Sequence, residues 1–283
     1  NKNLPQNLYF DARRSTYRYR RPTDGKWFQF GTDRIKAIDA ANVANIPVIA
    51  YDRLITDSDL DLYVTFDNVK VGEAQAQYLI DALGGKGKII RIYGAPTDNN
   101  ARLFKTGQDN VLNPYIARGD IEVIHEDWAD NWETQRAKQI TNAAITNHGH
   151  NFVAILASND GTAGGAIQAL KEEGMMGKVL VTGQDADLAA SQRIVEGSQA
   201  MSIYKPIRAL ATTAADFAVK LATAKPVIAR NELDNGKLLV PSVFLPVTVV
   251  TKDNMMQTIV ADGFHSFDDV YRNVPADQRP QAH

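Results

Sequence analysis

The stretch from residue 152 to residue 187, FVAILASNDGTAGGAIQALKEEGMMGKVLVTGQDAD, constrains the fold more than any other part of the chain. Two apolar runs, 152–157 and 178–182, flank a segment of small residues. This order predicts a strand, a helix and a second strand, with polar residues after each strand. Because ligands of open parallel sheets bind beyond the carboxyl ends of the strands, we expect a site at Asn159 and Asp185.

These polar residues also have a simpler interpretation. Asn159 or Asp160 is suited to cap the helix that follows it, and Asp185 or Asp187 to cap the next helix. Caps of this kind are a common signal at helix starts. For any one of these residues, capping and ligand binding therefore remain alternatives.

Length and composition set broad limits. The 283 residues suffice for one large domain or two ordinary ones, and 44% hydrophobic with 23% charged residues is typical of a globular protein. No apolar run approaches the roughly eighteen residues of a membrane span, so we expect no membrane insertion. The first residues lack the apolar segment of a signal peptide, although a mature secreted protein would look the same. The absence of cysteine excludes disulfides and thiolate metal sites.

Charge is distributed unevenly along the chain. The formal net charge is −2, but residues 1–36 hold nine basic and three acidic side chains. The remaining residues therefore carry a net negative charge. This asymmetry predicts two parts with different partners.

The basic part, residues 1–43, is predicted to form three short aromatic-rich strands and a helix that begins near residue 34. Strand side chains alternate, which places Arg18 and Arg20 on one face. Such a face could enter a DNA major groove, although a charge run is more often simply solvated. The candidate DNA-binding residues are Arg13, Arg14, Arg18, Arg20 and Lys26.

The segment LPQNLYFDARRSTYRYRRPTDGKWFQFGTDRIKAIDAAN resembles the amino-terminal arm-binding domain of lambda-type phage integrases. The matching features are Leu4-Pro5, Asn7-Leu8-Tyr9, the two tyrosines of STYRYR, the turn DGK and the sequence GTDR. The resemblance implies a small three-stranded sheet with a helix that binds DNA. The catalytic half of such integrases has no counterpart downstream, so recombination is not expected.

Further along the chain, apolar strands are predicted at 46–51, 62–66, 88–93 and 121–124, and again near 200–204. One candidate set consists of the polar residues at or beyond the ends of these strands and of the two strands predicted within 152–187. We group them because the carboxyl ends of parallel strands converge on one edge of a sheet. Carboxylates, amides and an arginine suit vicinal hydroxyls, and a tryptophan offers an apolar face to a sugar ring. The set consists of Asp52, Arg53, Asp98, Asn100, Trp132, Asn159, Asp185 and Lys205.

The motifs IPVIAYDRLI, GAPTDNNARLFKTGQ, DWADNWETQRA, ASNDGTAGGAIQAL and GQDADLA resemble the periplasmic D-xylose-binding proteins of ABC importers. The similarity runs in the family's order over about residues 44–265. It implies two α/β lobes of doubly wound parallel sheets that close around a pentose, with the eight residues of this set as sugar contacts. It also implies a membrane permease as partner and a periplasmic location.

The resemblance also indicates a departure from the family. The first strands of the amino-terminal lobe have no counterpart, and a helix entering IPVIAYDR is joined to the integrase-like helix. We therefore expect a chimera with an incomplete amino-terminal lobe and hinge-crossing segments (44–87 plus about 207–270), a complete carboxy-terminal lobe (88–206) and a disordered tail (271–283).

Other functions are less well supported by the residues. The five histidines are scattered without metal-ligand spacing, so no metal site or other cofactor is expected. Asp52 and Asp98 could imitate a glycosidase pair, but carboxylates in a pocket fit binding equally well. We predict non-catalytic binding of a xylose-like monosaccharide. The alternative is a DNA-binding protein whose body acts as sensor or scaffold, which would place it in the cytoplasm.

Overall fold

The computed structural model describes residues 8–11, 16–20, 27–31 and 34–281, with side chains from residue 35 onward. The chain divides into two compact units. Unit 1 consists of Asn1–Thr65 and Arg208–Phe244, and unit 2 of Phe66–Ile207 and Leu245–His283. Each unit has its own sheet and its own buried cluster of apolar side chains.

Unit 2 is built on a parallel sheet with the strand order β7-β6-β8-β9. A backbone bridge from Gln184 to Ile203 continues it to β10, which pairs antiparallel with β13. The elements are α2 (Asn68–Ala82), β6 (Gly87–Tyr93), α3 (Asn99–Ala117), β7 (Ile121–Trp128), α4 (Thr134–His148), β8 (Ala154–Ala157), α5 (Asp160–Glu172), β9 (Leu180–Val181), α6 (Leu188–Glu196), β10 (Ser202–Tyr204) and β13 (Thr248–Val250).

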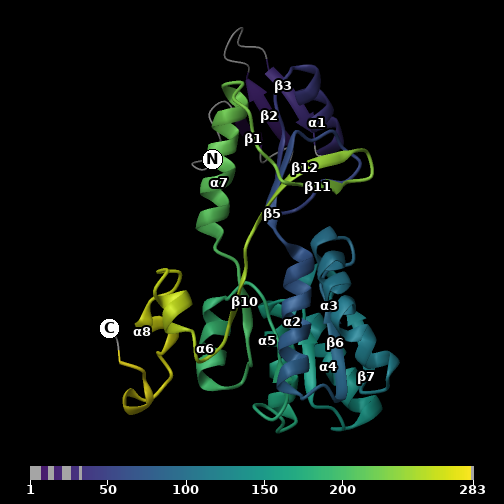
Figure 1. Cartoon of the computed structure of the whole chain (residues 1–283), viewed down its shortest axis with the longest axis vertical. Coiled ribbons are helices and arrows are strands. Elements are labelled where there is room, and N and C mark those ends of the chain that lie inside the picture. Colours follow the sequence, from purple (N-terminus) through teal and green to yellow (C-terminus); the bar gives the residue numbers. More distant parts are fainter. Residues whose placement is uncertain (1–7, 12–15, 21–26, 32–33, 282–283) are drawn as a thin grey trace. The chain divides into compact units, whose positions relative to one another are not determined.

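Helices cover both faces of this sheet (Figure 1). The central strand β6 shows how: Ile89 packs with α2 and α3, whereas Ile90 and Ile92 pack with α4 and α5. Strands buried on both faces are rich in apolar residues, and the strand predicted at 88–93 is confirmed as β6. The strand-helix-strand unit predicted at 152–187 is likewise confirmed as β8, α5 and β9.

The carboxyl-terminal residues belong to the core of unit 2. A short helical segment, Met256–Val260, and α8 (Phe267–Val270) pack in one cluster with α6. Tyr271 is 3% exposed in this cluster, and Arg279 donates from Nε to the carbonyl oxygen of Val274 at 2.7 Å. The prediction of a disordered tail is therefore wrong for residues 271–281, because Tyr271 is buried and Arg279 is bonded to the backbone of the same segment.

Unit 1 contains a sheet with the order β11-β12-β5-β4, in which β4 and β5 are parallel. Its cluster joins Ile38, Ala50, Tyr63 and Val240. A separate antiparallel sheet, β1-β2-β3, precedes α1 as predicted. The elements are β1 (Leu8–Asp11), β2 (Thr16–Arg20), β3 (Trp27–Gly31), α1 (Arg34–Val43), β4 (Ile49–Tyr51), β5 (Leu62–Phe66), α7 (Ile207–Ala222), β11 (Asn231–Asp234) and β12 (Leu239–Leu245).

The antiparallel hairpin β11–β12 forms one side of this sheet. Its turn contains Asn235 and Gly236, a dipeptide typical of tight hairpins. The Asn235 side-chain oxygen accepts from the backbone amides of Lys237 and Leu238, each at 3.0 Å. Gly236 has φ 92°, which glycine adopts without a side-chain clash.

Helix α2 lies in unit 2, whereas the boundary expected at residue 88 placed it with the amino-terminal lobe. The reason is its close packing on α3 (Figure 1). A Cβ at Gly72 of α2 would lie 2.0 Å from the Phe104 carbonyl oxygen, and one at Gly107 of α3 would lie 1.9 Å from the Val69 carbonyl oxygen. Glycine at both positions therefore lets the two backbones touch.

We expect Gly107→Ala to lower the free energy of unfolding by at least about 2 kcal/mol, since the added methyl group meets backbone that cannot rotate away. Urea denaturation followed by circular dichroism measures this. Gly164→Ala in α5 is the matched control, because its nearest neighbour is a side-chain atom of Arg193 at 3.4 Å. A loss in Gly107→Ala no larger than in the control would contradict the close packing of α2 on α3.

Candidate functional site

Six of the eight predicted sugar contacts lie in unit 2, at or beyond the carboxyl ends of its strands. They follow β6, β7, β8 and β10 and the extension of β9, which is the edge where ligands of parallel sheets bind. These residues are Asp98, Asn100, Trp132, Asn159, Asp185 and Lys205.

Asp98 caps helix α3 and also holds Trp132, the side chain that was predicted to offer an apolar face to a sugar ring. Its Oδ1 accepts from the Asn100 backbone amide at 3.0 Å at the start of α3, and its Oδ2 accepts from Trp132 Nε1 at 3.1 Å. The indole lies so close to Gly94 that a Cβ there would sit 2.0 Å from a ring carbon. Phe104 contacts the indole with ring centroids 6.2 Å apart. The tryptophan is therefore held in one orientation.

Asn100 is 4% exposed, and its Oδ1 accepts from Asn68 Nδ2 at 3.1 Å. Sequence reasoning did not select Asn68, although this residue lies two positions beyond the end of the predicted strand at 62–66. Its position as the first residue of α2 was the available signal. The two amides fix each other at this edge of the sheet.

Asn159 forms a capping box at the start of α5, so the capping interpretation is confirmed for it. Its Oδ1 accepts from the Thr162 backbone amide at 2.8 Å, and Thr162 Oγ1 accepts from the Asn159 amide at 3.2 Å. The cap holds this side chain at the strand end. A sugar contact by Asn159 remains a prediction.

Asp185 pairs with Lys205 across neighbouring strands, with Oδ1 and Nζ 2.8 Å apart. Nζ also lies 5.8 Å from the centre of the Phe66 ring. Asp185 has φ 98° and Ala186 has φ 54°, two successive non-glycine residues in the left-handed region. This backbone conformation costs about 1–3 kcal/mol of free energy per residue and persists only where the surrounding structure imposes it.

A buried carboxylate lies behind this turn. Asp160 is 2% exposed and accepts from Gln199 Nε2 at 2.8 Å, Ser202 Oγ at 2.9 Å and the Asp187 backbone amide at 3.0 Å. The sequence predicted Asp160 only as a possible cap. Its partners lie far along the chain, so no local pattern indicated the cluster.

Burial governs the protonation of the acids here. It raises the pKa of Asp160 to about 7, and the negative charge of Asp185 adds to the rise, while donors from Gln199 and Ser202 oppose it. Burial and Asp185 also raise the pKa of Asp187. Asp187 stands before α6, but its side chain makes no capping hydrogen bond, so that capping prediction is wrong.

Asp52 and Arg53 belong to unit 1 and follow β4. Asp52 has φ 59°, and its carbonyl oxygen accepts from Tyr63 Oη at 2.7 Å and Thr65 Oγ1 at 2.8 Å. The Arg53 amide donates to the Tyr51 carbonyl oxygen at 2.7 Å. These bonds fix the backbone of the turn that carries both predicted contacts.

The candidate DNA-binding residues are only partly covered by the structure. Arg18 and Arg20 lie in β2, where the backbone of Arg18 pairs with Tyr9 and Gln29. Their side chains, and hence the predicted basic face, are outside what the structure describes. Arg13, Arg14 and Lys26 lie outside the described residues altogether.

Metal ligation and membrane insertion find no support in the described part of the chain. Among those residues, no group of three or more histidine or acidic side chains is placed to hold a metal ion. None of the helices formed by them is long and apolar enough to cross a membrane.

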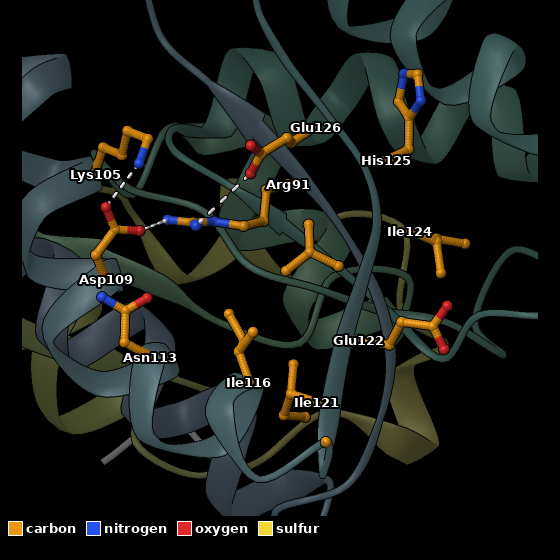
Figure 2. Close-up of a pocket in the computed structure, with 12 residues that line it drawn as sticks. Arg91, Lys105, Asp109, Asn113, Ile116, Ile121, Glu122, Ile124, His125 and Glu126 are labelled. Carbon is orange, nitrogen blue, oxygen red and sulfur yellow. Dashed lines mark hydrogen bonds and ion pairs between the residues drawn. The ribbon is translucent and has the colours of Figure 1, made fainter.

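A hollow of about 870 Å³ lies elsewhere on unit 2, lined by α3 and β7 (Figure 2). Figure 2 shows Arg91 between two acids, with its Nη2 2.7 Å from Asp109 and its Nη1 3.8 Å from Glu126. Lys105 pairs with the same Asp109 at 2.6 Å. The eight predicted sugar contacts, all described by the structure, are absent from its lining. The charges in this hollow compensate one another.

Comparison with known proteins identifies the family. A model described as "Periplasmic binding protein domain" matches residues 32–226. The chain belongs to the periplasmic binding protein family. A second model, the arm DNA-binding domain of bacteriophage lambda integrase, matches residues 1–53. Both resemblances predicted from the sequence are thus confirmed.

Similar curated proteins bear sugar names. This periplasmic binding protein is 49% identical over 234 residues to the D-xylose-binding periplasmic protein of Haemophilus influenzae, covering 83% of this chain and 70% of the relative. It is 46% identical over 228 residues to the protein of that name from Escherichia coli K12, covering 81% and 69%.

A solved structure agrees in fold. A carbohydrate transporter solute-binding protein from Chloroflexus aurantiacus, in complex with D-glucose, matches with a TM-score of 0.77 and 36% identity. The match covers 82% of this chain and 76% of that one. The α/β periplasmic-binding-protein fold predicted from the sequence is confirmed.

The buried Asp160 predicts a pH dependence of stability. Its pKa is about 7 in the folded protein against an ordinary 3.8, so the folded state binds the proton more tightly between these values. The stabilising contribution is complete below about pH 3.8 and is lost as pH rises through 7. Relative to Asp160→Asn, wild type should lose up to about 1.4 kcal/mol of unfolding free energy per pH unit in this window.

Urea denaturation at several pH values measures both proteins, and the difference between them removes titrations that they share. Equal slopes of unfolding free energy against pH for wild type and Asp160→Asn would contradict the raised pKa.

Proposed function

We propose that this periplasmic binding protein binds a monosaccharide, D-xylose or a similar pentose, without catalysis. The observation that carries the proposal is its 49% identity to a protein named for D-xylose binding, across 83% of this chain. The strand ends of unit 2 support it chemically, because they gather carboxylate, amide and ammonium groups beside an oriented indole. These groups complement sugar hydroxyls and the apolar face of a pyranose.

The residue roles follow from this chemistry. Asp98, Asn100, Asn159 and Asp185 accept from or donate to hydroxyls, Lys205 donates, and Trp132 stacks on the ring. Asp52 and Arg53, which lie in unit 1, remain predicted sugar contacts. The charged pair of Asp185 and Lys205, with Nζ 2.8 Å from Oδ1, presents an acceptor and a donor side by side, which suits two vicinal hydroxyls.

The cellular role is part of the proposal. Family members of this type deliver sugars to a membrane permease of the ABC class, and we propose the same partner here. The location that follows is the periplasm, in agreement with the names of the relatives.

Isothermal titration with D-xylose, D-glucose and D-ribose tests the proposal. We expect D-xylose to bind most tightly and Trp132→Ala to weaken its binding at least about tenfold, since 1.4 kcal/mol of stacking energy corresponds to a factor of ten. Trp128→Ala is the matched control, because Trp128 lies in β7 and packs on Tyr93 with ring centroids 4.8 Å apart. No heat with any of the three sugars would refute the proposal.

DNA binding through the first residues is a second candidate. The match of residues 1–53 to an arm DNA-binding domain favours it, as does the antiparallel sheet β1-β2-β3 followed by α1. In that case the sugar-binding body would act as sensor or scaffold, and the protein would work in the cytoplasm.

Fluorescence anisotropy with duplex DNA at about 50 and about 200 mM salt tests this candidate. Affinity should fall steeply with salt, and an Arg18→Ala, Arg20→Ala double variant should reduce the slope by about 0.9 for each phosphate that the protein no longer neutralises. Lys171→Ala, in α5 of unit 2, is a control for removal of one positive charge. Absence of binding at the lower salt concentration would exclude the candidate.

A further inference from the structure

The turn from residue 183 to residue 187 presents Asp185, yet its backbone is unfavourable by itself. Asp185 and Ala186 both have positive φ, at 98° and 54°. Side chains other than glycine avoid this region, so external contacts must impose the conformation. The source of those contacts decides where the Asp185 carboxylate points.

The contacts come from beneath the turn, from Asp160 at the start of α5 and Ser202 in β10. The Ala186 amide donates to Ser202 Oγ at 3.0 Å, and Ser202 Oγ donates to the Asp160 carboxylate at 2.9 Å. The Asp187 amide donates directly to Asp160 Oδ2 at 3.0 Å. Two successive backbone amides of the turn are therefore held by one carboxylate, directly or through one hydroxyl.

The carboxylate is itself fixed. Gln199 Nε2 donates to its Oδ1 at 2.8 Å, and Arg193 Nε donates to Gln199 Oε1 at 2.9 Å. Arg193 Nη2 also donates to the Asp160 carbonyl oxygen at 3.0 Å. Gly183 leaves room for the group, because a Cβ there would lie 2.0 Å from Asp160 Oδ1. Buried charge-assisted hydrogen bonds of this kind are strong and directional.

The turn has further supports. The Asp185 amide donates to the Ile203 carbonyl oxygen at 2.8 Å. A ring nitrogen of His265 lies 2.8 Å from the Ala186 carbonyl oxygen. The Asp185 side chain then meets Lys205 Nζ at 2.8 Å. The backbone of the turn is thus bonded to Asp160, to β10 and to His265, while the Asp185 carboxylate is directed to the cation of the proposed sugar site.

We propose that Asp160 is a positioning residue for sugar binding: its buried carboxylate, with Ser202, clamps the amides of Ala186 and Asp187 and thereby sets the direction of the Asp185 side chain. Asp160 itself does not touch the ligand, being covered by the turn and by β10. This inference rests on the proposed function, since it assigns Asp185 to the sugar site, but the clamp also exists without ligand.

Hydrogen exchange in the ligand-free protein tests the clamp independently of any sugar. Asp160→Asn leaves one donor without an acceptor, so the amides of Ala186 and Asp187 should exchange at least about tenfold faster. Amides of β8, such as Ile155, should keep their protection. Unchanged exchange at Ala186 and Asp187 would overturn the proposal, whether or not the protein binds sugar.

Affinity for D-xylose tests the consequence. Titration at a temperature where circular dichroism shows a folded protein should give an affinity about ten- to hundredfold weaker for Asp160→Asn. Asp185→Asn should weaken binding as well, and the double variant should be no weaker than Asp185→Asn alone, because Asp160 acts through Asp185. If the reductions caused by Asp160→Asn and Asp185→Asn instead multiply in the double variant, Asp160 has a general structural role and the proposal is overturned.

Two further variants keep the test decisive. Ser202→Ala retains the carboxylate but removes the bond to the Ala186 amide, so it should speed exchange at Ala186 and weaken binding even if Asp160→Asn does not fold. Thr141→Ala is the control: its buried hydroxyl in α4 donates to the Ala137 carbonyl oxygen at 3.0 Å, remote in the fold from the turn. The control should lose stability but not affinity.

Failure of wild type to bind any sugar would refute the proposed function, while the exchange data would still decide whether the clamp exists.

Discussion

The polar edge of unit 2 depends on one buried acid, the carboxyl group of Asp160. It joins the start of α5, the turn before α6 and strand β10 through four hydrogen bonds. A buried carboxylate is tolerated only where donors surround it, and these donors come from backbone and side chains that must lie in fixed places. The same hydrogen bonds that satisfy this buried group therefore order the turn that carries Asp185.

Capping does not exclude ligand binding at this edge. Asp98 caps α3 with one oxygen and orients the Trp132 indole with the other, and Asn159 caps α5 through a reciprocal pair of bonds. A cap fixes both the backbone and the rotamer of the residue that supplies it. A side chain held in this way loses little further freedom when a ligand binds, which favours affinity.

The sequence predicted the parts of this protein that local patterns determine. The strand-helix-strand unit at 152–187 was recognisable because two apolar runs flank a segment of small residues. The positions of the strand ends followed from these two runs. Three features were not predictable in this way. The Asp160 cluster joins residues 39 and 42 positions apart, α2 lies in unit 2 because glycines permit contact with α3, and Tyr271 is buried by tertiary packing. Each depends on neighbours that the chain brings together only when folded.

The Asn235-Gly236 turn is different, since its dipeptide was a readable hairpin signal.

The central claim is that the strand ends of unit 2 form a sugar site, and a crystal structure of the protein grown with saturating D-xylose tests it most directly. We predict one pentose at this edge, within hydrogen-bond distance of Asn159 and Asp185 and stacked on Trp132. A sugar bound elsewhere, for example in the hollow beside Arg91, or an edge without sugar at saturating concentration, would contradict the claim.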